Sequence, residues 1–233
     1  DMARHCRCGG EADAIAIRIA RAASNKDKVA FCGYHGWHDW YLSANWNSND
    51  ALGEHLIPGL NPVGVPKNLK DTAFPFKYND FDGLLLILEN HDIGTIIMEP
   101  MRGEEPKDNF LHKIRNLCND KNIILIFDEV SSGFRLNSGG LHLLYDVNPD
   151  MAIFAKAMSN GYPFGSIIGK KDIMSVAQET FISSTYWTED IGFSAAIATI
   201  KKHQKCNVGN HINELGMYFQ REIKKISENT GIK

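Results

Sequence analysis

The chain has 233 residues, and its 25 basic and 28 acidic side chains give a formal net charge of −3 at neutral pH. That balance gives no electrostatic reason to expect nucleic acid or an anionic membrane surface as a partner. The hydrophobic content of 43% is ordinary for a globular protein, and no apolar run approaches the length of a membrane-spanning helix.

The first third of the chain contains one clear helix and one clear strand. Small and aliphatic residues recur at helical spacing and predict a helix over residues 11–23. Residues 29–32 are apolar and end at Gly33, which predicts a short buried strand. The segment from residue 34 to residue 79 is rich in Gly, Pro and aromatic residues, so we expect it to be mostly irregular.

Helices and apolar strands alternate from residue 81 onwards. Strands that are apolar throughout and are separated by helices indicate a mainly parallel sheet that is buried on both faces. The predicted fold is therefore α/β, with three layers in the order α/β/α. Helices are expected at residues 81–90, 110–120, 194–203 and 208–228, and strands at residues 95–98, 123–127, 151–154 and 166–168.

Two chemically useful residues follow neighbouring strands of this predicted sheet. Asp128 and Lys156 each come directly after an apolar strand, and about one β-α-β unit of chain separates them. Ligands of such sheets bind beyond the carboxyl ends of the strands, so we expect the two side chains to meet there. A partly desolvated lysine is a nucleophile toward aldehydes, and an ionised aspartate keeps a pyridine nitrogen protonated. The alternative is a structural ion pair between Asp128 and Lys156.

Two further features could complete a cofactor site. Gly9 and Gly10 lie directly before the first predicted helix, where backbone N–H groups and the helix dipole attract an anion such as phosphate. The alternative is that the two glycines form only an entry turn. The ring of Tyr34, in the loop after the first strand, could lie on a flat heterocycle, although packing alone would also explain it.

Five motifs then occur along the chain in a recognisable order. They are Gly9-Gly10-Glu11-Ala12, Gly33-Tyr34-His35-Gly36, Glu99-Pro100, the stretch from Asp128 to Arg135, and the stretch from Lys156 to Pro163. In this combination they resemble the class III pyridoxal-phosphate aminotransferases over nearly the whole chain. Within that family the pattern is most similar to the branch of glutamate-1-semialdehyde aminomutase and related sugar- or polysaccharide-pathway aminotransferases.

The resemblance implies a fold, a cofactor and a reaction. The fold would be that of the large domain of the fold type I pyridoxal-phosphate transferases. The cofactor would be pyridoxal 5′-phosphate, held as a Schiff base by Lys156, which would also move the proton during transamination. Asp128 would pair with the pyridinium nitrogen, and His35 would form a hydrogen bond near Asp128. The reaction would transfer an amino group between an amine or amino acid and a carbonyl compound.

The remaining contacts that the resemblance implies concern the ring and the phosphate. Val130 would pack against the cofactor ring on the side opposite Tyr34, and Gly9 and Gly10 would hold the phosphate. Thr188 would reach across a homodimer interface to the partner's cofactor phosphate, so the active site would need two subunits. Cys8-Gly9-Gly10 stands where the family usually has Ser or Asn, then Gly, then Ser or Thr. This difference removes a hydroxyl donor and would leave the phosphate contacts to backbone amides.

The resemblance covers the large domain only. Residues 1–233 are expected to form the cofactor-binding domain, without the N-terminal arm and the C-terminal small domain of the family. Two alternatives to an aminotransferase stay open: a 2,1-aminomutase of the glutamate-1-semialdehyde type, and a noncatalytic cofactor-binding or assembly domain. A dinucleotide-binding protein is disfavoured, because no Gly-x-Gly-x-x-Gly follows the first strand.

The cysteines indicate neither a disulfide framework nor a zinc site. They are odd in number and scattered, and no secretory signal precedes them, so we expect reduced thiols in a cytoplasmic protein. Zinc is disfavoured because no second Cys pair follows at finger-like spacing. The cysteines are Cys6, Cys8, Cys32, Cys118 and Cys206.

Overall fold

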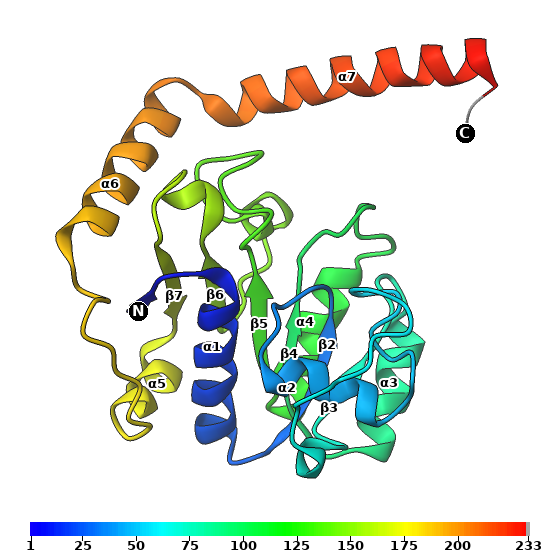
Figure 1. Ribbon diagram of the computed structural model, residues 1–233, viewed down its shortest axis with the longest axis vertical. Coiled ribbons are helices and arrows are strands. Elements are labelled where there is room, and N and C mark those ends of the chain that lie inside the picture. The colour runs from blue at the N-terminus through cyan, green and yellow to red at the C-terminus, as the bar shows by residue number, and fades with distance from the viewer. Residues whose placement is uncertain (232–233) are drawn as a thin grey trace.

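A seven-stranded sheet organises residues 1–231, the part of the chain that the computed structural model describes (Figure 1). The strands lie in the order β1-β7-β6-β5-β4-β2-β3. The pairs formed among β2, β3, β4, β5 and β6 are parallel, whereas β7 is antiparallel to both β6 and β1. The strands are β1 (Met2–Cys6), β2 (Lys28–Cys32), β3 (Ala73–Pro75), β4 (Ile93–Met98), β5 (Ile124–Asp128), β6 (Met151–Phe154) and β7 (Gly165–Gly169).

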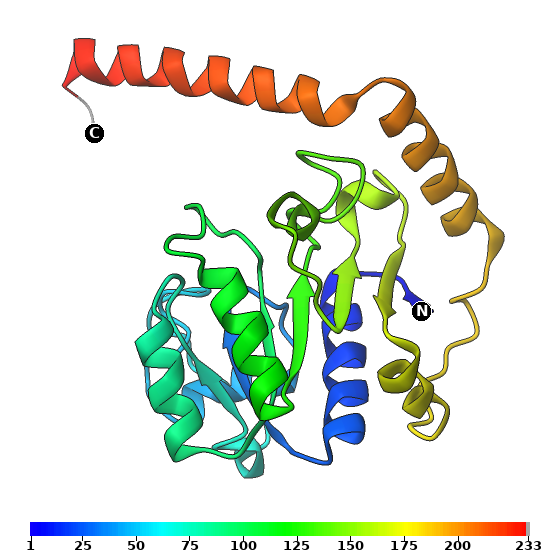
Figure 2. The same cartoon turned by 180° about the vertical axis from the view of Figure 1, so that it is seen from behind.

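Helices cover both faces of the sheet, which gives the three layers that the sequence predicts. Figures 1 and 2 show α1 on one face and α3 and α4 on the other. Side chains alternate along β2 to match: Phe31 packs with α1, whereas Ala30 and Cys32 pack with α3 and α4. The helices are α1 (Gly9–Ser24), α2 (Asp39–Leu42), α3 (Phe81–Asn90), α4 (Phe110–Lys121), α5 (Lys171–Met174), α6 (Asp190–Lys205) and α7 (Val208–Thr230).

Local chain chemistry places the ends of the central helices. The carboxylate of Asp80 accepts a hydrogen bond from the N–H of Gly83 at 2.9 Å, which caps the start of α3. Asn25 and Asn122 adopt the left-handed conformation directly after α1 and α4, where asparagine is well tolerated. Each helix therefore stops just before the buried strand that follows it.

The expected helices and apolar strands are present, but two edge strands differ from the prediction. β1 contains Arg4 and His5, and it is recognisable as a strand only through its antiparallel pairing with β7. β3 has three residues, ends in Pro75 and pairs only with β2, in a region predicted to be irregular. Short strands that contain proline are typical of sheet edges, where pairing with one neighbour is sufficient.

The last helix, α7, leaves the body of the sheet, whereas α6 packs against it through Phe193, Ala196 and Ile200. Figure 1 shows α7 running past the top of the molecule, and most of its side chains are exposed. In residues 1–231, none of the helices has both the length and the apolar character that crossing a bilayer would require. All five cysteines are free thiols, as expected.

Candidate active site

The carboxyl ends of β5 and β6 and the loop after β2 meet the start of α1 at one edge of the sheet. A cavity of about 350 Å³ lies there, and six residues singled out in the sequence line it. These residues are Gly9, Gly10, Tyr34, Asp128, Val130 and Lys156. Residues far apart in the sequence are thus brought together, because β5 and β6 are neighbours and run parallel.

A larger hollow of about 660 Å³ lies at the opposite edge of the sheet. The buried carboxylate of Asp150 borders this hollow, and its partners are Arg115 at 3.0 Å and Lys170 at 2.7 Å. The carboxylate is therefore already paired with two cations, and the hollow lies at the amino ends of the strands. We therefore place the candidate site in the smaller cavity.

Asp128 is held in one orientation by two hydrogen-bond donors. The last residue of β5, it accepts the Nδ1–H of His35 at 2.8 Å through Oδ2 and the N–H of Val130 at 2.9 Å through Oδ1. Both Asp128 and His35 are buried, and the ring of His35 packs against Trp40 and Tyr41. The hydrogen bond expected between His35 and Asp128 is therefore present. Asp128 is thus a rigidly held acceptor at the inner end of the cavity.

Lys156 lies two residues after the end of β6 and has an unusual backbone conformation. Its φ angle is +43°, a left-handed value that is uncommon for a residue with a side chain. Its Nζ donates a hydrogen bond to Oγ of Ser131 at 2.8 Å. The ion pair between Lys156 and Asp128, the structural alternative, is absent from residues 1–231. Lys156 is exposed, so the expected partial desolvation is wrong for the chain as described.

The start of α1 forms a narrow wall of the cavity. Cys8 precedes the helix without capping it through its side chain, which leaves first-turn N–H groups free to bind an anion. A Cβ atom on Gly9 would lie 2.7 Å from Cγ1 of Val130, and one on Gly36, at φ +88°, would lie 2.8 Å from Cα of Gly10. The glycines therefore let the helix, the loop after β2 and Val130 approach one another closely.

A hydrogen-bonded network holds the loop that carries Tyr34. The N–H of Tyr34 donates to Oε2 of Glu99 at 3.1 Å, and Arg102 donates to the same oxygen at 2.7 Å. Arg102 also donates to the carbonyl oxygen of His55 at 2.7 Å, and Nδ1 of His55 accepts the N–H of Gly33 at 3.2 Å. Burial, followed by the nearby Arg102 cation, lowers the pKa of His55 to about 4. These hydrogen bonds fix the position of the loop that carries Tyr34.

Glu129 is a structural residue next to the site. It is fully buried, and its Oε1 accepts both the N–H of His142 at 2.9 Å and the Nδ1–H of His142 at 2.7 Å. Its other oxygen accepts the hydroxyl of Ser132. Glu129 therefore ties the loop after β5 to the turn around His142, and it does not line the cavity.

Thr188 lies outside the cavity of its own chain and is exposed. Its neighbour Glu189 accepts a hydrogen bond from Arg7 at 2.6 Å, and Arg7 also donates to the carbonyl oxygen of Tyr186. Arg7 itself lines the cavity. The segment around Thr188 is thus held beside the cavity, and the Thr188 hydroxyl forms no hydrogen bond within residues 1–231.

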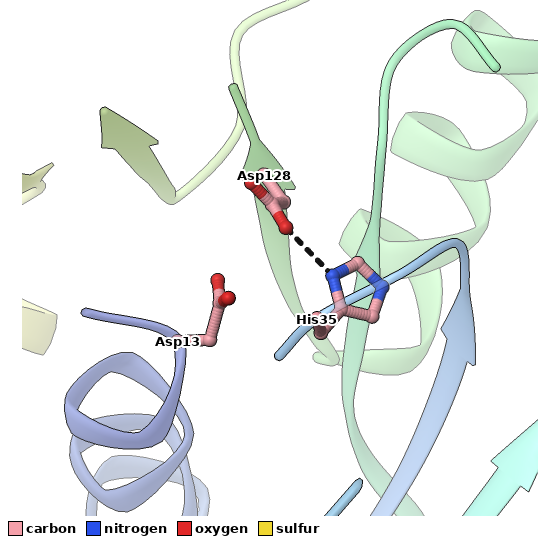
Figure 3. A group of neighbouring side chains, drawn as sticks. All are labelled: Asp13, His35 and Asp128. Atoms are coloured by element: carbon pink, nitrogen blue, oxygen red, sulfur yellow. Dashed lines mark hydrogen bonds and ion pairs between the residues drawn. The ribbon is translucent and has the colours of Figure 1, made fainter. Parts of the chain in front are cut away.

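Asp13, which the sequence analysis did not single out, also lines the cavity. It is 2% exposed. One of its carboxylate oxygens lies within 4.8 Å of a ring nitrogen of His35 and of a carboxylate oxygen of Asp128 (Figure 3). We assign no metal to this group, because His35 and Asp128 already form a hydrogen bond with each other. The signal in the sequence is a single acid on the apolar face of α1, one turn after Gly9.

The sequence itself has many relatives among class III aminotransferases. The family model described as aminotransferase class III matches residues 1–233. The chain is 37% identical to 3-aminobutyryl-CoA aminotransferase of Cloacimonas acidaminovorans (strain Evry), over 100% of this chain and 54% of that protein. It is 36% identical to glutamate-1-semialdehyde 2,1-aminomutase of Desulforamulus reducens, over 89% of this chain and 50% of that protein. The chain spans about half the length of the curated relatives it matches.

Solved structures share the fold. The FumI protein of Sphingopyxis sp. MTA144, in its pyridoxal-phosphate internal aldimine form, aligns with a TM-score of 0.85 at 21% identity, over 99% of this chain and 54% of that chain. A transaminase with pyridoxal phosphate bound aligns with a TM-score of 0.83 at 23% identity, over 100% of this chain and 56% of that chain. These likenesses confirm the predicted transferase fold. The family match over residues 1–233 shows that this chain belongs to the class III aminotransferase family.

Proposed function

We propose that residues 1–233 form the cofactor-binding large domain of a pyridoxal-phosphate-dependent aminotransferase. The observation that carries the proposal is one cavity that holds both Lys156 and a rigidly oriented Asp128 at adjacent strand ends. The cavity volume of about 350 Å³ suits a small aromatic ring with a phosphate group. Its uncapped helix start faces the same space and suits the phosphate.

Different residues of the cavity would bind the ring and the phosphate of the cofactor. The N–H groups of Gly9 and Gly10 would bind the phosphate, because the triplet Cys8-Gly9-Gly10 offers no hydroxyl there. Tyr34 and Val130 would enclose the ring and exclude water from it. Asp128 would accept the N–H of the pyridinium, and the hydrogen bond from His35 keeps that carboxylate aimed into the cavity.

Pyridoxal phosphate, when bound, supplies an aldehyde that reacts with amines and a ring that accepts the electron pair of a carbanion. Lys156 is the amine of this chain that lines the same cavity, so it would bind the cofactor covalently. With a substrate bound in the cavity, Nζ of Lys156 would accept and return the proton at the reacting carbon of the substrate. Ser131 lies within hydrogen-bond distance of Nζ and would hold the amine between these steps.

The substrates are proposed to be small molecules: an amine or amino acid as donor and a carbonyl compound as acceptor. We also propose a homodimer in which Thr188 contacts the partner's cofactor phosphate, which is consistent with its exposed hydroxyl outside its own cavity. Cytoplasmic localisation stays a prediction. The match to glutamate-1-semialdehyde 2,1-aminomutases supports the second candidate, a reaction that returns the amino group to a neighbouring carbon of the same substrate.

The direct test is cofactor capture by the purified chain. Adding pyridoxal phosphate should give an absorbance band near about 400 nm, and borohydride should fix the cofactor to Lys156. The variant Lys156→Ala should lose both signals, whereas Lys171→Ala, which removes an exposed lysine outside the cavity, should keep them. A chain that never takes up the cofactor would contradict the proposal.

A second experiment separates chemistry from binding alone. An added amino donor should convert the bound cofactor to its pyridoxamine form, which absorbs at shorter wavelength. Binding without this conversion would support the noncatalytic alternative. Analysis of the product with a full-length protein then separates the two enzymatic candidates, because only an aminomutase leaves the amino group on the same carbon skeleton.

A further inference from the structure

Asp13 is a buried acid that the proposed chemistry does not use. It lies in the first turns of α1 and is 2% exposed, and its Oδ1 has no hydrogen-bond partner. One oxygen of Asp13 lies within 4.8 Å of a side-chain oxygen of Asp128 and of a ring nitrogen of His35. Figure 3 shows the Asp13 carboxyl group directed from the helix toward Asp128. A buried polar group without a hydrogen-bond partner destabilises the folded chain, so the protonation state of Asp13 affects stability.

Two carboxyl groups this close in a buried site do not both ionise. Asp128 has the two donors that stabilise a carboxylate, from His35 and from Val130. Asp13 has no such donor in residues 1–231. Burial, followed by repulsion from Asp128, raises the pKa of Asp13 well above its ordinary value. The proton of the pair therefore belongs to Asp13.

The titratable groups around Asp13 come from several elements. Asp128, Glu99 and Cys8 act against its ionisation, and Lys156 acts in favour of it. Cys6 of β1 and His35 of the loop after β2 are also near Asp13. The titratable groups that interact with Asp13 or lie beside it are therefore Cys6, Cys8, His35, Glu99, Asp128 and Lys156.

We propose that Asp13 is a positioning residue of this cavity: it carries a proton at neutral pH and directs that O–H toward Asp128. A protonated acid is a hydrogen-bond donor, so Asp13 supports Asp128 instead of competing with it. Asp128 is then the single carboxylate that faces a bound pyridinium. This role rests on the proposed cofactor site, but the protonation of Asp13 is a property of the chain without the cofactor.

The first test measures the thermal midpoint of the cofactor-free chain against pH, for the wild type and for Asp13→Asn. The Asp13 carboxyl group loses its proton at about pH 3.9 in the unfolded chain, whereas in the folded chain it keeps the proton to higher pH. The wild-type stability therefore falls as the pH rises toward the folded pKa, and the asparagine variant lacks this loss. The midpoint of the variant minus that of the wild type should grow by about 3 °C or more between about pH 5 and about pH 8.

The control for this test is Asp150→Asn at the opposite edge of the sheet. Asp150 is also buried, but it is paired with Arg115 and Lys170. Its neutralisation removes the partner of two cations and should lower the midpoint at about pH 8. A midpoint difference for Asp13→Asn that stays constant or shrinks with rising pH would overturn the proposal, because Asp13 would then be ionised in the folded chain.

The second test titrates pyridoxal phosphate into folded variants at neutral pH. Asparagine is neutral and keeps a donor, so Asp13→Asn should restore most of the affinity that Asp13→Ala loses, and the alanine variant should bind about tenfold more weakly than the wild type. Equal weakening in both variants would show that a charge at residue 13 is required and would refute the proposal. If the wild type itself does not bind pyridoxal phosphate, the proposed function is refuted. The pH dependence of the thermal midpoint then still tests whether Asp13 is protonated.

Discussion

A methyl group added to Gly9 tests the geometry of the cavity wall directly. In Gly9→Ala the new Cβ would lie 2.7 Å from Cγ1 and 3.0 Å from Cγ2 of Val130, well inside the usual carbon contact distance of about 3.5–4.0 Å. Val130 has little freedom to move, because it is buried and its N–H is hydrogen-bonded to Asp128. The contact must therefore be relieved by a shift of α1 or of the residue that follows β5.

Two opposing effects set the size of the change in stability. Alanine is favoured over glycine in a helix by about 1 kcal/mol, whereas overpacking in a well-packed site costs about 1–3 kcal/mol. We expect a net loss of about 0–2 kcal/mol in the free energy of unfolding. This corresponds to a drop of at most about 8 °C in the thermal midpoint for a chain of this size. Cofactor affinity should fall as well, because Val130 and the helix start both line the cavity.

The assay is thermal unfolding of a double-mutant cycle. If contact with Val130 causes the loss, the destabilisation by Gly9→Ala should shrink by about 1 kcal/mol or more when Val130 is also replaced by Ala. Gly10→Ala is the matched control in the same turn, since its Cβ would meet no atom closer than 3.4 Å. An equal loss from Gly9→Ala in the wild-type and Val130→Ala backgrounds would refute the packing argument.

Three further outcomes follow from the hydrogen bonds around the cavity. His35→Leu removes one donor from the strand-end carboxylate and should weaken cofactor binding by about tenfold or more in an absorbance titration; unchanged affinity would contradict the role of that hydrogen bond. Arg102→Met removes a hydrogen-bond donor from the network that holds the loop of Tyr34, and it should weaken cofactor binding by about threefold in the same titration. Cofactor affinity equal to that of the wild type would show that the network is dispensable. The pKa of His55 is about 4 when folded and about 6.5 when unfolded, so the unfolded chain binds more protons between these values and stability falls as the pH drops. In His55→Gln, the thermal midpoint should fall less as the pH drops through this range. An unchanged fall would show that other groups cause it.

Local patterns were sufficient for the layers of the fold and for much of the site. Helical spacing and uniformly apolar strands are short-range properties, and they placed the helices around 81–90 and 110–120 and the central strands correctly. The position of Asp128 and Lys156 directly after such strands predicted that they meet, because parallel strands end at one edge. The short strand at 73–75 was missed, since only its pairing with a neighbour defines it.

Contacts between distant residues decided what the side chains of the site do. The sequence indicated a desolvated lysine, but the fold leaves Lys156 exposed and bonded to Ser131. Asp13 is one acid among many in the sequence. Only the packing of α1 against the sheet buries it beside Asp128, and that burial determines where its proton resides. Spacing along the chain predicts which elements form, whereas the environment of an ionisable group depends on every element that surrounds it.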